Sequence, residues 1–140
     1  MNIDIARFAE QEFARRRQTA RGKVASRTLD ADVAELHLRP WLALALRCGA
    51  DPASLDQDLP EQIAGRAPAC SGGTARALVA LDYCPADEAL AVLARARDHA
   101  VSREDGTPDR AERAYGLVLM GMHLGAPPPS REAIRERLAA

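Results

Sequence analysis

Six cationic residues occupy positions 15 to 27, and no acidic residue lies among them. Side chains of this kind can neutralise several phosphates of a nucleic acid at once. The six are Arg15, Arg16, Arg17, Arg21, Lys23 and Arg27. Two interpretations compete: an arm that binds nucleic acid, and a basic helix end that continues into a solvated connector over residues 15–29.

The charge of the remaining chain favours the connector. Residues 31–140 contain twelve basic and sixteen acidic residues, a formal charge of −4, which would repel a polyanion outside the arm. No aromatic residue is interleaved with the arginines to stack on bases. Arginines near the C-terminus of a first helix also interact favourably with its dipole. We therefore expect a connector, with nucleic-acid binding as the alternative.

The cysteines and histidines do not form a catalytic or metal-binding signature. They are Cys48, Cys70, Cys84, His37, His99 and His123. The cysteines lack the close pairs typical of zinc sites, and no two histidines have the four-residue spacing of a helical zinc site. We expect reduced thiols, no metal or cofactor and no catalytic residues. A reactive Cys70, in the glycine-rich turn of residues 70–74, is the enzymatic alternative.

Composition predicts a single all-α domain covering residues 1–140. A chain of 140 residues has the length of one domain, and 29 alanines and 16 leucines greatly outnumber the 14 valines, isoleucines and threonines. The longest apolar run, residues 41–46, is far shorter than the roughly 20 residues needed to cross a bilayer. The N-terminus lacks the pattern of a signal peptide. We expect a cytoplasmic protein without a membrane partner.

Apolar spacing and capping residues predict a bundle of five to seven helices. The carboxylate of Asp30 is expected to cap the second helix, and Pro40 is expected to kink it because proline lacks a backbone N–H. Beyond Pro40 the helix has no polar face, which is typical of a helix surrounded by others. The remaining helices are predicted at residues 3–17, 54–63, 74–83, from 85 to about 101, at 108–124 and from 130 onward.

The C-terminal stretch 117–140 resembles the turn and recognition helix of helix-turn-helix regulators. In MHLGAPPPSREAIRERLAA, one helix ends in Leu-Gly and the next begins with Ser-Arg. The resemblance implies that Arg131 and Arg135 face DNA. Three consecutive prolines at residues 127–129 lengthen the turn, and a docked amphipathic helix explains the same residues. We favour the docked helix.

One predicted helix carries more soft apolar surface than a peripheral element needs. Its candidate interaction residues are Tyr115, Leu119, Met120 and Met122. A central position in the core explains the same residues. Taken together, the sequence predicts a non-enzymatic protein-interaction or regulatory module, an adaptor or inhibitor that binds a protein partner or itself. The alternative is a DNA- or RNA-binding regulator that uses the basic arm and the C-terminal stretch.

Overall fold

The computed structural model describes residues 3–51 and 84–127. These residues form four helices, α1 (Ile5–Ala25), α2 (Ala31–Arg47), α6 (Ala86–Arg103) and α7 (Pro108–Leu124). No strand occurs in this part of the chain, and the predicted all-α class is confirmed. The helices expected at residues 54–63, at 74–83 and from 130 onward lie outside the described residues. The count of five to seven helices therefore stays a prediction.

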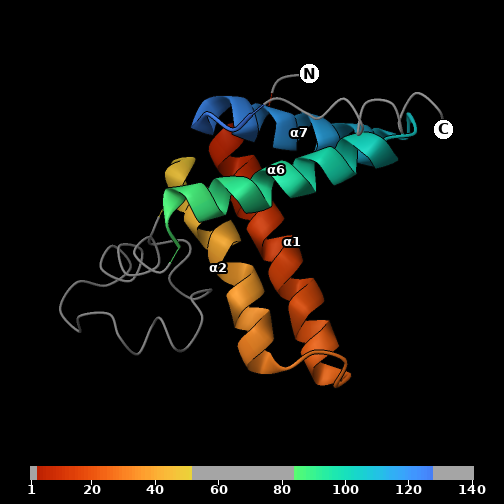
Figure 1. Cartoon of the computed structure of the whole chain (residues 1–140). Helices are drawn as coiled ribbons and strands as arrows, with labels where there is room; N and C mark the ends of the chain where they lie inside the picture. Colours follow the sequence, from red (N-terminus) through yellow and green to blue (C-terminus); the bar gives the residue numbers. More distant parts are fainter. Residues whose placement is uncertain (1–2, 52–83, 128–140) are drawn as a thin grey trace.

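The four helices form two antiparallel pairs. Helices α1 and α2 lie side by side, and α6 and α7 lie side by side across one end of them (Figure 1). Helix α6 also packs on α2, and α7 packs on α1. The core lies where the two pairs cross, so side chains of α1, α6 and α7 face a common region.

Helix α1 is longer than predicted. Asp4 caps its start by accepting a hydrogen bond from the backbone N–H of Arg7 at 3.2 Å. The predicted end near residue 17 is wrong, because a single glycine at position 22 costs a helix only about 1 kcal/mol relative to alanine. The helix ends where the hydroxyls of Ser26 and Thr28 each donate to the carbonyl of Lys23 at 3.1 Å. Most of the basic stretch is therefore helical.

Helix α2 begins directly after Asp30, as predicted. Asp30 occupies the N-cap position, but the predicted capping bond from its side chain is absent. The helix runs without a break through Pro40, and the kink expected there stays a prediction. Gly49 has a φ of 92°, and the N–H of Ala50 donates to the carbonyl of Ala45 at 3.0 Å. Left-handed closure of a helix by glycine is the expected C-terminal signal.

The C-terminal half of α2 is the centre of the core, as its lack of a polar face predicts. Residues 41–45 are all buried, with Trp41 the most exposed of them at 3%. The other large, fully buried apolar side chains come from the three remaining helices: Phe13, Leu93, Leu117 and Met120. Burying each such side chain stabilises the fold by roughly 1.5–3 kcal/mol.

Helices α6 and α7 begin within one residue of their predicted starts, but neither has a side-chain hydrogen bond at its N-cap. Thr107 is the N-cap of α7, Pro108 is its first residue, and Gly125 closes it with a φ of 80°. Pro85 is the N-cap of α6 instead of its first residue. The buried guanidinium of Arg97 binds Asp98 at 3.1 Å and donates to the carbonyl of Pro127. This contact fixes the chain after α7 against α6.

Gly116 lies where α7 packs closely on Phe8 of α1, and Gly22 is a control position without such a contact. A Cβ atom at Gly116 would overlap the ring of Phe8, whereas one at Gly22 would meet no atom within 4 Å. We expect Gly116→Ala to lower the free energy of unfolding by about 1–2 kcal/mol, because overpacking displaces the ring. We expect Gly22→Ala to raise it by about 0.5–1 kcal/mol, because alanine favours the helix. Urea unfolding measures both changes. Stabilisation by Gly116→Ala would contradict the close packing.

Candidate anion-binding cleft

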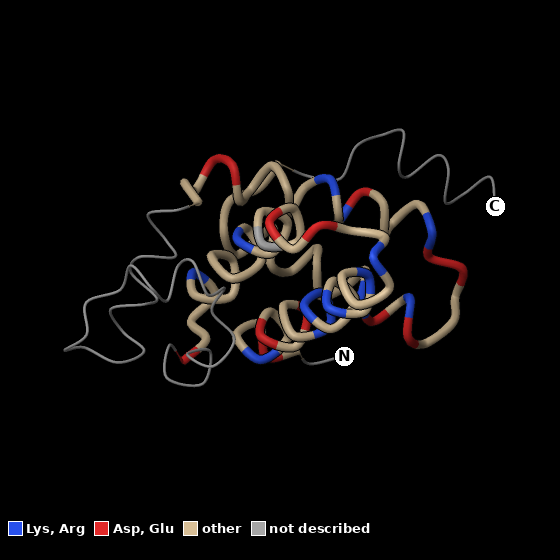
Figure 2. Tube along the Cα trace, turned by 90° about the horizontal axis from the view of Figure 1, so that it is seen from below, with Lys and Arg blue, Asp and Glu red and all other residues tan. Residues whose placement is uncertain are grey.

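The basic stretch does not present one surface. Arg15, Arg21 and Lys23 are exposed on α1, whereas Arg16 is half-buried and faces the other helices. Arg27 follows the helix, with a φ of 62°. Figure 2 shows Lys and Arg positions gathered along α1. Arg16 is therefore the residue of this stretch that the fold directs toward α6 and α7.

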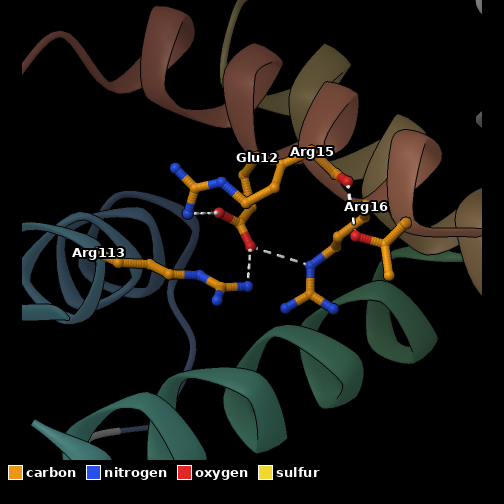
Figure 3. Close-up of polar contacts among 5 residues, drawn as sticks. Glu12, Arg15, Arg16 and Arg113 are labelled. Carbon is orange, nitrogen blue, oxygen red and sulfur yellow. Dashed lines mark hydrogen bonds and ion pairs between the residues drawn. The ribbon is translucent and has the colours of Figure 1, made fainter. Parts of the chain in front are cut away.

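A buried carboxylate organises the arginines around it. Glu12 is 1% exposed, and its carboxylate contacts Arg113 of α7 at 2.8 Å and Arg16 at 3.0 Å (Figure 3). Arg15 adds an ion pair at 3.6 Å. One carboxylate thus faces three guanidinium groups, so positive charge remains in excess around it. The contact with Arg113 also links α1 to α7.

Arg16 is held from a second direction by Trp41. Its guanidinium carbon lies 3.7 Å from the centre of the indole ring, in cation–π geometry. Burial lowers the pKa of Arg16, and the nearby Glu12 opposes that shift. Arginine nevertheless stays protonated at physiological pH. The contacts with Glu12 and Trp41 give Arg16 a fixed position before any ligand arrives.

Helices α1, α6 and α7 enclose a cleft of about 520 Å³. This is within the range of roughly 300–1,000 Å³ found for small-ligand sites. Its ionisable lining residues are Arg16, Arg95, His99, Arg103, Arg110 and Arg113. None of the described residues that line the cleft is acidic. We call this site the arginine cleft.

Two of the five arginines of the arginine cleft make no ion pair with another described residue. Arg110 makes an ion pair with Asp105 at 3.0 Å. Arg16 and Arg113 each make an ion pair with Glu12. Arg95 and Arg103 are exposed, and neither has an ion-pair partner in the described part of the chain. Unpaired guanidinium groups in a concave site favour an anionic ligand.

A second hollow extends the positive surface between α1 and α2. It has a volume of about 330 Å³ and shares Arg16 and Arg113 with the arginine cleft. A third, of about 550 Å³, lies along α1 and is lined by Arg15, Arg17 and Arg21. Arg15 lines both the second and the third hollow, so neighbouring hollows share arginines.

The predicted apolar interaction surface is divided by the fold. Tyr115 is 42% exposed and Met122 is 74% exposed, whereas Leu119 is half-buried. Met120 is fully buried and belongs to the core, so its assignment to a surface is wrong. Tyr115, Leu119 and Met122 are three or four positions apart and share one face of α7, whereas the side chain of Met120 points from another face into the core. Arg131 and Arg135, the predicted DNA contacts, lie outside the described residues.

Sequence reasoning missed most of the arginine cleft. Arg95, His99 and Arg103 are spaced by four residues, which places them on one face of α6, and this spacing was the available signal. Arg113 could not be paired with Glu12 from sequence, because 101 positions separate them. Only the packing of α7 on α1 brings the two side chains together.

The described thiols are unsuited to nucleophilic catalysis. Burial raises the pKa of Cys48 to about 11 and also raises the pKa of Cys84, so both remain protonated at neutral pH. Cys70, the candidate nucleophile, lies outside the described residues. Within residues 3–51 and 84–127, no three His, Cys, Asp or Glu side chains gather as a metal site. No helix in these ranges is long and apolar enough to cross a membrane.

No family of known proteins, no curated protein and no solved structure matches this chain.

Proposed function

We propose that this protein is a non-enzymatic adaptor or regulatory module that binds an acidic segment of a partner protein in the arginine cleft. The observation that carries the proposal is the convergence of five arginines from three helices on one cleft. Arginine binds oxyanions through short, charge-assisted hydrogen bonds. Arg113 already makes one such bond, at 2.8 Å to Glu12. A second copy of this chain is included among the possible partners.

The residues of the cleft support binding more than proton transfer. Guanidinium groups keep their protons at every physiological pH and cannot act as general bases. A charge pattern made almost entirely of permanent cations is typical of recognition sites for acidic or phosphorylated segments.

The shape of the cleft favours a peptide segment over a nucleic-acid duplex. Duplex DNA presents its phosphates along an extended backbone, which requires contacts spread over a long surface. In the arginine cleft the charges converge on one hollow between helices. The alternative, a DNA- or RNA-binding regulator, would use cations of α1 outside the arginine cleft, among them the exposed Arg21 and Lys23.

Two double variants of equal charge distinguish these sites. Arg95→Gln/Arg103→Gln alters the cleft, and Arg21→Gln/Lys23→Gln, called the outer-face variant, alters α1 outside the cleft; all four residues are exposed. We expect the cleft variant to bind fluorescein-labelled hexaglutamate at least about tenfold more weakly than the intact protein. A hydrogen bond to a charged group is worth about 1.5–3 kcal/mol, and 1.4 kcal/mol is about tenfold. The outer-face variant should change affinity less than about twofold.

Fluorescence anisotropy measures these affinities over a salt series. Duplex DNA and single-stranded RNA are titrated in parallel. Nucleic-acid binding that falls steeply with salt and is lost in the outer-face variant alone would replace this proposal with the alternative. The proposal is also wrong if no acidic peptide binds at low salt, or if the cleft variant binds as tightly as the intact protein.

A further inference from the structure

The charge balance of the arginine cleft indicates which anion it binds. Five guanidinium groups line the cleft, and two carboxylates, those of Glu12 and Asp105, make ion pairs with three of them. The described residues thus leave a surplus of three positive charges. One carboxylate of a ligand brings a single negative charge. A phosphorylated side chain brings about −1.5 to −2 charges and three acceptor oxygens at neutral pH.

The positions of the arginines also suit an oxyanion with several acceptors. Arg16 and Arg113 approach from α1 and α7 and share the carboxylate of Glu12 (Figure 3). Arg95 and Arg103 approach from α6. A tetrahedral phosphoryl group can accept hydrogen bonds from several such directions at once, whereas a planar carboxylate accepts them near one plane.

One side of the cleft is ordered before the ligand arrives. Arg16 is held by Glu12 at 3.0 Å and by the ring of Trp41 at 3.7 Å, and Arg113 is held by Glu12 at 2.8 Å. Binding therefore loses little side-chain entropy at these two residues. The unpaired Arg95 and Arg103 can then close on the ligand from the facing helix.

Building on the proposed function, we infer that the arginine cleft binds a phosphorylated serine or threonine side chain of the partner protein. Phosphorylation of the partner would then control the association. Clusters of arginine are the common means by which proteins recognise phosphorylated segments. The proposed function requires only that the partner segment is acidic, whereas the inference requires that a phosphorylated side chain enters the cleft.

Three labelled peptides that differ at one position test the inference. Their sequence is Ala-Gly-Ala-Xaa-Ala-Gly-Ala, with phosphoserine, glutamate or serine at Xaa. We expect the phosphoserine peptide to bind the intact protein at least about tenfold more tightly than the glutamate peptide. The Arg95→Gln/Arg103→Gln variant should lose this difference, and the Arg21→Gln/Lys23→Gln variant should keep it. Fluorescence anisotropy provides the affinities.

The outcomes separate this inference from the proposed function. Equal affinities for the phosphoserine and glutamate peptides would overturn the inference and leave the proposed function standing. No binding of these peptides or of hexaglutamate would overturn both. Inorganic phosphate is titrated alone and followed by the fluorescence of Trp41, the only tryptophan of the chain, which contacts Arg16. Phosphate that binds as tightly as the phosphoserine peptide would overturn the assignment to a partner's side chain.

Discussion

Replacing Glu12 by glutamine is expected to lower the free energy of unfolding by about 3 kcal/mol. Removal of one partner from a buried ion pair costs about 3–5 kcal/mol, because the remaining charge is left without compensation. The lower end applies here, since the side chains of Arg16 and Arg113 stay 30% and 39% exposed. The variant keeps the size of the side chain, so the loss reports the charge. Urea unfolding followed by circular dichroism measures it.

Glu10→Gln is the matched control for this change. Glu10 lies on the same helix, is half-buried and makes no ion pair with another described residue. Its replacement should change the free energy of unfolding by less than about 0.5 kcal/mol, as is usual for such positions. Equal stabilities of the Glu10 and Glu12 variants would show that the carboxylate of Glu12 does not hold α1 and α7 together.

Replacing Trp41 by alanine is expected to lower the free energy of unfolding by about 3–5 kcal/mol. The indole is 97% buried at the centre of the core, since only 3% of its surface is exposed, and its loss leaves a large cavity. The change also removes the ring beneath Arg16, a contact worth about 0.5–2 kcal/mol. Because the chain has a single tryptophan, the unfolding of this variant is followed by far-ultraviolet circular dichroism.

Trp41→Phe separates the cavity from the cation–π contact. Phenylalanine keeps an aromatic face for Arg16 and most of the buried volume, so we expect it to lose less than half as much stability as alanine does. In the background of Arg16→Met, the difference between tryptophan and phenylalanine should shrink, because no cation remains above the ring. A difference that stays the same in both backgrounds would show that Arg16 and Trp41 are not energetically coupled.

The sequence by itself determined the class of the fold and most of the ends of the four described helices. Alanine and leucine favour helix over strand wherever they dominate, and that preference is local. The closures at Gly49 and Gly125 and the start of α7 at Pro108 also depend on neighbouring residues alone. The apolar half of α2 was recognisable as core because a helix without a polar face must be surrounded.

Tertiary structure decided which of the charged residues act together. The six cations of residues 15–27 are close together in the sequence. A helix points successive side chains in different directions, so only Arg16 of the six lines the arginine cleft. Glu12 looks like an ordinary surface acid, but the packing of α7 on α1 buries it against Arg113. Met120 was equally compatible with a surface and a core position. Pairings between distant residues depend on how the helices pack, which local patterns do not specify.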